Sequence, residues 1–394
     1  MSNPDTAHAP SPAGLSRRLL RSLGTTLVVI LLCGVAALIA EGAASLYMFA
    51  HDVVAAQPPR DILRPHMQHD TLLGWVHRPE ARVPNEYGAG IGLATNRQSF
   101  RGARNVELKA PTGIVRVTCS GDSFTLGYGV DDTHTWCARL EAEVPGLEAI
   151  NMGQVDYGLD QTYRWYMQDG ESLAPQVHIL ALTYLQLERA LSTSTNGRPK
   201  THLELNGTQA VVAGAPVAAP SSGSFRRATA ARVFGDVSIV QWFQHFGRFS
   251  PMQRTQRDIE AKWPMFEAVL ASLANVHRKR GSALVLVYLP TRQEVSAGVL
   301  DKPRHLVATS AAKLGISFID LTPPLRALPA DSSDNAFILA TPSGAAPDIA
   351  GHYSNLGHLW VARQVAQALA RAPKSSAREL LRLQLAARQF NALR

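Results

Sequence analysis

The chain of 394 residues has few cysteines and little charge, and the common patterns of metal sites are missing from it. Three cysteines are too few for a scaffold that is built on disulfides. No Cys-x-x-Cys and no His-Glu-x-x-His occurs, so the sequence predicts no metal site and no other cofactor. Charged residues make up 18% and hydrophobic residues 46%, which excludes a disordered chain and leaves enough apolar material for one large domain or two ordinary ones.

The formal net charge of +8 raises the question of a nucleic-acid partner. Much of the excess lies at the two ends, in residues 1–24 and 374–394. No basic stripe with interleaved aromatic residues stands between them. The sequence therefore predicts that the chain binds no nucleic acid.

Long hydrophobic runs are absent except for one near the N-terminus. Residues 23–40 are all apolar, Gly or Thr, and a second apolar stretch follows closely. This predicts a single-pass transmembrane helix over residues 25–48, since about 20 mostly apolar residues cross a bilayer. Arginines precede the run, so the positive-inside rule places residues 1–24 in the cytoplasm and the main domain beyond the inner (cell) membrane, periplasmic or extracellular. A cleaved signal peptide and a buried core helix are the alternatives.

The rest of the chain changes character near residue 111. Residues 52–110 have little periodicity and are interpreted as an irregular lead-in with short strands, such as 91–95. Beyond them, β-rich runs alternate with helical patterns, which predicts an α/β domain over residues 111–372, with a parallel sheet and helices on both faces. Its strands are predicted at 114–119, 149–152, 177–184, 283–289 and 316–320, and its helices at 135–144, 159–171, 252–280, 303–314 and 356–371.

Two further segments stand apart from this alternation. An insertion lies at about 191–250. Its part 191–232 is rich in Ser, Thr, Gly and Ala, and it includes a predicted hairpin with its turn at Asn206-Gly207. Because it follows the third strand, we hypothesise that it is a flexible cap or lid over the site. Residues 373–394 form a basic C-terminal tail, which is expected on a membrane surface, against a partner, packed on the domain or unstructured.

Three motifs stand where strands end or where the last helix begins. Gly121-Asp122-Ser123 follows the first strand, and a parallel sheet carries its site at the carboxyl ends of its strands. Gly153 follows the second strand, where its backbone N–H could receive a developing negative charge. His352 precedes the last helix and could be the base that a serine nucleophile needs. Each motif alone is also typical of an ordinary turn or cap.

In this order the motifs resemble the blocks of the SGNH/GDSL hydrolase family. The lead-in, with Leu-Gly-Trp at 73–75 and Phe-Arg-Gly at 100–102, is similar to that of membrane-anchored bacterial members associated with surface polysaccharides. The resemblance covers roughly residues 70–190 and 280–372. It implies a three-layer, flavodoxin-like fold in which Ser123 is the nucleophile and His352 the base.

Two positions depart from the family pattern. The family has an Asn after the third strand as an oxyanion donor; here Gln186 is the nearest side-chain amide. The family's acid lies two or three residues before the His, whereas Asp348 lies four before His352. We therefore expect either a triad with Asp348 or a Ser–His dyad, with Gly153, the Ser123 N–H and Gln186 as candidate oxyanion donors.

The resemblance implies an exported serine esterase or O-acyltransferase that acts on acyl esters of a cell-envelope or extracellular polysaccharide. Its candidate partners are then an acylated glycan, the membrane and polysaccharide biosynthesis proteins. The alternative is a catalytically inactive protein of the same fold that binds glycan or assists polysaccharide assembly. Export also makes a disulfide between Cys119 and Cys137 an option, with two buried thiols as the other.

Overall fold

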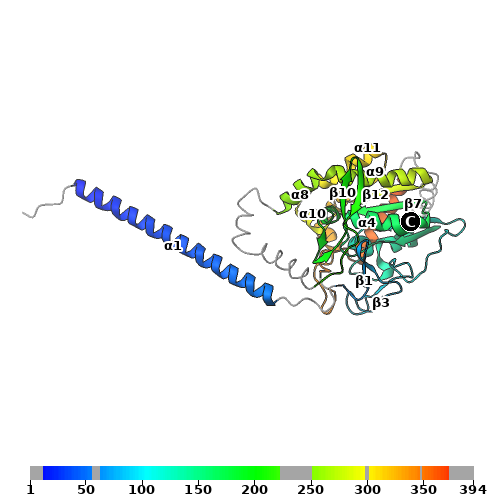
Figure 1. Cartoon of the computed structure of the whole chain (residues 1–394), viewed down its shortest axis with the longest axis horizontal. Helices are drawn as coiled ribbons and strands as arrows, with labels where there is room; N and C mark the ends of the chain where they lie inside the picture. Colours follow the sequence, from blue (N-terminus) through cyan, green and yellow to red (C-terminus); the bar gives the residue numbers. More distant parts are fainter. Residues whose placement is uncertain (1–11, 56–62, 222–250, 298–300, 347, 372–394) are drawn as a thin grey trace, which may run out of the picture. The chain divides into compact units, whose positions relative to one another are not determined.

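The computed structural model describes residues 12–55, 63–221, 251–297, 301–346 and 348–371, which fall into two compact units. The described part of the first unit is one helix, α1 (Pro12–Ala55), drawn in blue in Figure 1. Among the described helices it is the one long and apolar enough to cross a membrane, over Ser22–Tyr47. These 26 residues reach about 39 Å at 1.5 Å per residue. The helix predicted over 25–48 is confirmed, and it continues beyond both of those ends.

The second unit is built on a parallel sheet of five strands. They are β5 (Val115–Ser120), β6 (Leu147–Asn151), β7 (Val177–Leu182), β12 (Ala283–Tyr288) and β13 (Ser317–Asp320). Their order across the sheet is β13-β12-β7-β5-β6, and every pairing is parallel. This is the flavodoxin-like order, and the predicted α/β fold is confirmed. The order reverses between β5 and β7, so the carboxyl ends of these two strands flank the place where a ligand binds in such sheets.

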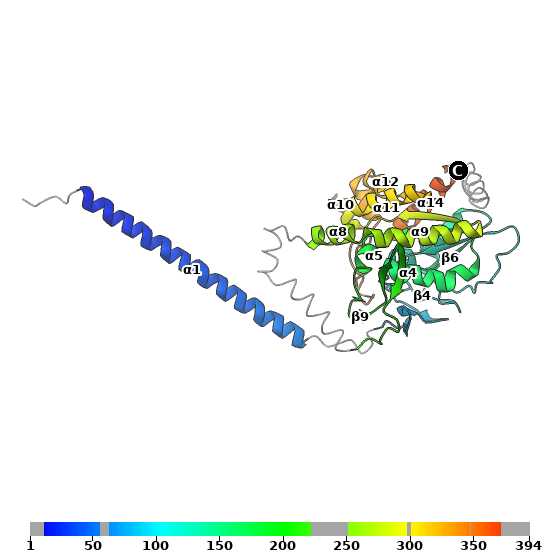
Figure 2. The same ribbon diagram turned by 45° about the horizontal axis from the view of Figure 1, so that its top comes forward.

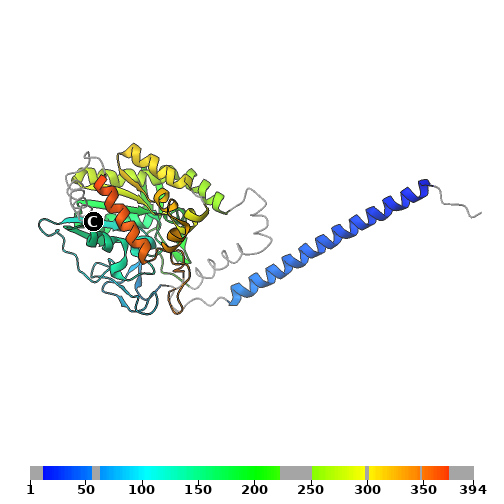
Figure 3. The same cartoon turned by 180° about the vertical axis from the view of Figure 1, so that it is seen from behind.

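Helices cover both faces of this sheet, which makes three layers. One face packs against α3 (Trp136–Glu143) and α14 (Asn355–Arg371), and Figure 3 shows α14 in red across it. The other packs against α4 (Leu159–Trp165), α9 (Trp263–Arg280) and α11 (Asp301–Leu314), which Figure 2 shows together. Side chains alternate between the two cores: in β7, Ile179 faces α3 and α14, while Leu180 faces the opposite layer.

Two predicted helices are shorter than the pattern indicated. The helix predicted over 252–280 is two helices, α8 (Pro251–Ala261) and α9, which meet at Lys262. Pro264 lies in the first turn of α9, where the missing N–H of proline costs no hydrogen bond. The helix predicted over 159–171 is α-helical only to Trp165 and continues as a π-helical turn and a 3-10 turn.

The lead-in is packed against the α/β domain. It forms two short antiparallel pairs, β1 (Met67–Asp70) with β2 (Gly74–His77) and β3 (Arg82–Val83) with β4 (Leu93–Ala94). The strand expected near 91–95 is β4. Trp75, Tyr87 and Phe100 are buried in the same core as α4 and α9. The lead-in thus belongs to the folded unit even though it has little regular structure.

The described part of the insertion is also packed. It contains β8 (Ser194–Thr195), β9 (Arg198–Pro199) and the predicted hairpin, β10 (His202–Asn206) with β11 (Gln209–Ala213). Lys200 is buried beside Asp160 of α4 and donates to its carboxylate. Residues up to 221 are thus tied to the domain. The remainder of the insertion, 222–250, and the tail, 373–394, lie outside the described residues, and the lid stays a hypothesis.

A disulfide between Cys119 of β5 and Cys137 of α3 joins the first strand to the helix that covers it. The sequence left this bond open against two buried thiols, and the structure forms it. The remaining short elements are α2 (Ser123–Leu126), η1 (Asp132–His134), α5 (Tyr184–Arg189), α10 (Arg292–Ala297), α12 (Thr322–Arg326) and α13 (Ala330–Asn335).

Candidate active site

Ser123 stands at the carboxyl end of the first strand, in the first turn after β5. It is the first residue of the short helix α2. The preceding residue, Asp122, caps this helix: its side chain accepts a hydrogen bond from the Phe124 N–H at 3.0 Å. This is an Asx cap, which Asp favours because its short carboxylate reaches the free N–H groups of a helix start. The cap fixes the direction in which Ser123 leaves the sheet.

The Ser123 hydroxyl meets His352, although 229 positions separate the two residues. The distance from Ser123 Oγ to His352 Nε2 is 2.9 Å. His352 comes from the loop before α14, which is held by two main-chain hydrogen bonds to Ile338, one from the Gly351 N–H at 2.7 Å and one to the His352 carbonyl at 2.8 Å. The structure therefore brings together the two residues predicted as nucleophile and base.

The other ring nitrogen of His352 has a main-chain partner. Nδ1 lies 3.2 Å from the carbonyl oxygen of Ile349. A carbonyl can only accept, so Nδ1 carries the hydrogen and Nε2 presents its lone pair to Ser123. This is the tautomer that a general base requires.

Asp348 does not take the place predicted for it. Its side chain is exposed, and no described carboxylate lies within ion-pair or hydrogen-bond distance of the His352 ring. The reason is the local turn: Asp348 adopts a left-handed conformation (φ 61°), and Gly351 a second one (φ 90°). This turn directs the Ile349 carbonyl, and not the Asp348 carboxylate, toward Nδ1.

The histidine is packed between two aromatic rings. The centroid of Phe124 lies 4.8 Å from that of His352, and the centroid of Tyr128 lies at 4.9 Å. Burial lowers the pKa of His352 to about 4; the hydrogen bond to the Ile349 carbonyl raises it, and the positive charge of Arg189 lowers it further. The ring is therefore neutral at physiological pH. Ser123 itself is only 2% exposed.

Gly153 lies close to the serine, but its N–H points elsewhere. This N–H donates to Oδ1 of Asn151 at 2.9 Å, so it is not presented to a substrate. A side chain at position 153 would collide with the main chain of Thr125 and Leu126 in α2. Position 153 must be glycine because α2 approaches it so closely, which is a supporting role and not the oxyanion role predicted for it.

Gln186 is also turned away from the site. It is fully buried in α5, and its Nε2 donates to the carbonyl oxygen of Ala181 at 2.8 Å. Its Oε1 accepts from the hydroxyl of Thr162 at 3.4 Å. Both ends of the amide are therefore used inside the domain, and the structure does not place Gln186 as an oxyanion donor.

Two residues that sequence reasoning missed hold the Asp122 side chain. The Thr183 hydroxyl donates to Asp122 Oδ2 at 2.9 Å, and Arg189 Nη1 donates to the same oxygen at 3.0 Å. Burial raises the pKa of Asp122, which Arg189 opposes. Thr183 directly follows β7, so its position at the strand end was a signal; Arg189, six residues further on, carries no local signal.

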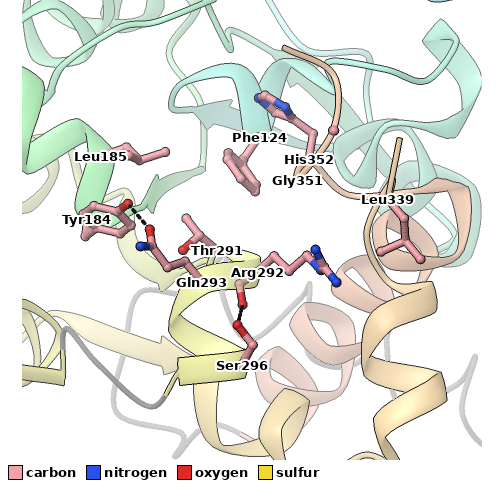
Figure 4. A pocket seen from close by; sticks show the side chains of 11 residues that line it. Phe124, Tyr184, Leu185, Thr291, Arg292, Gln293, Ser296, Leu339, Gly351 and His352 are labelled. Carbon is pink, nitrogen blue, oxygen red and sulfur yellow. Dashed lines mark hydrogen bonds between the residues drawn. The ribbon is translucent and has the colours of Figure 1, made fainter. Parts of the chain in front are cut away.

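A pocket of about 520 Å³ opens beside His352. Figure 4 shows the ring of Phe124 next to His352, with Tyr184 donating to Gln293 on the opposite wall. The pocket combines aromatic, apolar, amide, hydroxyl and guanidinium groups. Its lining residues are Phe124, Tyr184, Leu185, Thr291, Arg292, Gln293, Ser296, Leu339, Ala350, Gly351 and His352. No group of three His, Cys, Asp or Glu side chains in the described ranges is arranged to hold a metal ion.

Comparisons with known proteins find similarity in solved structures alone. No family model matches the chain, and no curated protein does. A putative lipolytic protein of the G-D-S-L family from Desulfitobacterium hafniense is 14% identical, with 64% of this chain and 99% of that chain covered at a TM-score of 0.34. A G-D-S-L lipolytic protein from Veillonella parvula is 11% identical, with 66% and 100% covered at a TM-score of 0.38.

A third similar structure is an acetyl-xylooligosaccharide esterase variant from Geobacillus. It is 14% identical, and the match covers 64% of this chain and 93% of that chain at a TM-score of 0.35. All of these are distant similarities. The solved structures similar to this α/β chain include GDSL-type lipolytic proteins and an esterase.

Proposed function

We propose that this chain is a membrane-anchored serine esterase or O-acyltransferase of the SGNH/GDSL type, acting on acyl esters of a cell-envelope or extracellular polysaccharide. The observation that carries the proposal is the 2.9 Å contact between Ser123 Oγ and His352 Nε2 at the carboxyl edge of the sheet. A serine hydroxyl and a correctly protonated imidazole at that distance are the two groups that acyl transfer requires.

The reaction runs through an acyl-enzyme. Ser123 Oγ attacks the ester carbonyl carbon while its proton passes to Nε2 of His352, which gives a tetrahedral intermediate. The bond to the leaving alkoxide then breaks, and His352 returns the proton to the departing oxygen. A second hydroxyl attacks the acyl carbon, loses its proton to His352 and takes the acyl group, after which Ser123 Oγ regains the proton. With water as the second hydroxyl the outcome is hydrolysis, and with a sugar hydroxyl it is acyl transfer.

The oxyanion of the intermediate has one free donor among those predicted. The N–H of Ser123 has no acceptor within the described part of the chain, whereas the Gly153 N–H and the Gln186 amide are engaged elsewhere. Loss of one such donor costs about 10²–10³-fold in rate. We therefore expect turnover to be slow unless substrate binding moves a further donor toward the carbonyl oxygen.

The pocket beside His352 suits a sugar ester. Its volume of about 520 Å³ lies in the range of small-ligand sites. Tyr184 and Phe124 offer aromatic faces, and Gln293 and Thr291 offer polar groups to hydroxyls. This mixture supports a carbohydrate substrate in preference to a long acyl chain, which would need a continuous apolar wall.

The location of the enzyme is part of the proposal. Helix α1 is long enough to anchor the chain, and the arginines that precede its apolar span support a cytoplasmic N-terminus. The disulfide between Cys119 and Cys137 suits an oxidising compartment, which supports export of the main domain. Protease added to spheroplasts should digest this domain, and its protection there would contradict the proposed orientation.

The second candidate function is glycan binding without catalysis. The near-complete burial of Ser123 and the inward-turned Gln186 favour it over a fully equipped hydrolase. The two candidates differ in the reactivity of Ser123, because a binding protein needs no activated hydroxyl.

The deciding experiment uses the full-length protein in detergent micelles and a fluorophosphonate probe. We expect one adduct by intact mass, mapped to Ser123, which disappears in Ser123→Ala and His352→Ala. Ser296→Ala removes another hydroxyl of the same pocket and should be labelled like the wild type. Release of acetate from an acetylated polysaccharide, with and without an added sugar acceptor, then separates hydrolysis from transfer. A folded wild type that takes up no probe would contradict the enzyme and leave the glycan-binding candidate.

A further inference from the structure

Asp122, which caps the helix that begins at Ser123, belongs to a continuous series of ion pairs. Arg189, the last residue of α5, contacts Asp122 at 3.0 Å and Asp156 at 3.5 Å, one through each terminal nitrogen. Asp156 in turn accepts from Arg198 of the insertion. Negative and positive charges therefore alternate from Asp122 through Arg189 and Asp156 to Arg198.

The far end of this series is fixed by the lead-in. The Arg198 guanidinium lies over the ring of Trp75, 4.6 Å from its centroid. Trp75 is fully buried, and its indole N–H donates to the Val155 carbonyl at 2.9 Å. Because an arginine on an aromatic face is held both electrostatically and by packing, Arg198 has little freedom to leave Asp156.

Asp156 is itself held in an unusual main-chain conformation. Its φ is +60°, a region that a residue with a side chain seldom adopts without support. The support here is the Arg198 pair and the Asn196 amide, which donates to Asp156 Oδ2 at 3.0 Å. Burial disfavours the charge on Asp156, yet the two arginines hold its pKa well below the usual range. The carboxylate that anchors Arg189 is thus ionised at neutral pH.

At the near end the series acts on the turn that carries Ser123. Asp122 is fully buried and uses both carboxylate oxygens: one accepts from the Phe124 N–H and the other from Thr183 and Arg189. Three donors hold this carboxylate, and its bond from the Phe124 N–H ties the first turn of α2 to it. A misplacement of about 1 Å at a reacting group costs on the order of 10²-fold in rate.

We propose that Arg189 is a positioning residue for the Ser123–His352 pair, held in place by the ion-pair series that ends on Arg198 and Trp75. The inference rests on the proposed function and deepens it. In this proposal the segment after the third strand supports the site through Arg189, although the family's Asn is absent. The described part of the insertion supports Arg189 through Arg198.

Arg189 also acts on His352 through its charge, and this effect separates a positioning role from a merely structural one. The charged groups that act on the His352 ring are Arg189, which lowers its pKa, and Asp156, which raises it. Replacing Arg189 with a neutral side chain removes a repulsive positive charge, so we expect the pKa of His352 to rise. A residue that only stabilises the fold leaves that pKa where it is.

The experiment is a titration of the histidine rings in the full-length protein, ¹³C-labelled at histidine, in detergent micelles. The His352 signal is assigned by its loss in His352→Ala. We expect its midpoint near pH 4 in the wild type, a higher midpoint in Arg189→Gln, and an almost unchanged midpoint in Arg189→Lys. Lysine keeps the charge but cannot span two carboxylates.

Fluorophosphonate labelling of Ser123 in the same variants reports geometry. Both Arg189→Gln and Arg189→Lys should be labelled about tenfold to 100-fold more slowly than the wild type. The matched control is Arg116→Gln, which breaks a buried ion pair with Glu148 at the opposite end of β5. It should lower thermal stability without moving the His352 midpoint.

The outcomes distinguish a positioning role of Arg189 from a purely structural one. An Arg189→Gln midpoint equal to that of the wild type, with labelling no slower than in Arg116→Gln, overturns the positioning role. A higher midpoint in Arg189→Gln but not in Arg189→Lys, together with slower labelling of both variants, supports the positioning role. A folded wild type that takes up no probe overturns the esterase proposal and the positioning role with it, and the titration then shows only the electrostatic coupling of Arg189 to His352.

Discussion

His352 Nδ1 lies 3.2 Å from the carbonyl oxygen of Ile349, so the group that orients this ring is the main chain. A carbonyl fixes the ring tautomer as well as a carboxylate does, because both can only accept a hydrogen bond. It carries a partial charge, however, and therefore stabilises the imidazolium form less. Within the described residues the arrangement is a Ser–His pair with an oriented imidazole, whose pKa is set mainly by burial.

Asp348→Asn should leave the chemistry unchanged. The Asp348 carboxylate is exposed and does not contact His352, so we expect fluorophosphonate labelling within about twofold of the wild type. Where a buried Asp orients the histidine of a triad, the same change costs about 10⁴-fold in kcat. The measurement is the second-order labelling rate, with His352→Ala as the inactive reference. A loss greater than 100-fold in Asp348→Asn would show that the carboxylate reaches the ring in the working enzyme.

Ser123 should stay reactive in mildly acidic solution. The base must be neutral to accept the serine proton, and burial lowers the pKa of His352 to about 4, so its neutral form persists as the pH falls. We expect the labelling rate at pH 5.5 to be close to that at pH 7.5. An unperturbed histidine, with a pKa of about 6.5, would leave only about a tenth of the rate. Circular dichroism at each pH is the control for folding, and a tenfold fall in a folded sample contradicts the burial argument.

Acid should nevertheless weaken the fold before it protonates the base. Burial lowers the pKa of five further histidines among the described residues. It falls to about 2 for His66, to about 3 for His77 and His358, to about 4 for His277, and well below its usual value for His178. A group whose pKa is depressed in the folded state binds protons more readily when unfolded, so its contribution to stability is lost as the pH falls below about 6.5. We expect Tm to fall steadily from pH 7 to pH 5, measured by thermal circular dichroism. A Tm that stays level or rises over this range would mean that these rings are not buried neutral.

The sequence pattern predicted the sheet well, because strands buried on both faces are continuous apolar runs that few other structures explain. All five strands lie within a few residues of the predicted positions. The pairing of Ser123 with His352 followed from the resemblance of the three motifs to a known family, since the strand-end rule locates Ser123 but not His352, which precedes a helix. The break between α8 and α9 was readable at Pro264 but is easily missed inside a long helical pattern.

The errors at the site concern side-chain partners. The sequence position of Gln186, just after the third strand, is compatible with a contact to substrate. In the structure its amide donates instead to the nearby Ala181 carbonyl. The roles of Asp348 and Gly153 were decided in the same way, by a left-handed turn and by the close approach of α2. Such competition between nearby partners depends on distances of an ångström or less, which periodicity and spacing do not encode.

Gly153→Ala should disable the site through the backbone. The added methyl group would meet main-chain atoms of Thr125 and Leu126, which cannot move aside as a flexible side chain can. We expect a loss of about 1–3 kcal/mol in the free energy of unfolding and labelling at least about tenfold slower, because α2 carries Ser123. Gly281→Ala is the matched control: its φ of +68° is strained for alanine, by about 1–2 kcal/mol, but nothing lies within 4 Å. Equal labelling rates in the two variants would contradict the role assigned to Gly153.

Reduction of the disulfide should destabilise the domain without involving Cys33. The bond joins Cys119 to Cys137 across 18 positions, and closing a loop of that size stabilises a fold by about 3 kcal/mol through the entropy of the unfolded chain. The double variant Cys119→Ser/Cys137→Ser should therefore unfold at a lower urea concentration than the wild type, and Cys33→Ser should not. Maleimide labelling of denatured, unreduced protein should find one free thiol of the three, and three reactive thiols in the exported protein would show that the bond does not form. Because Cys119 lies in the strand that leads to Ser123, labelling of the serine in the double variant should decline in parallel with the folded fraction as urea is added.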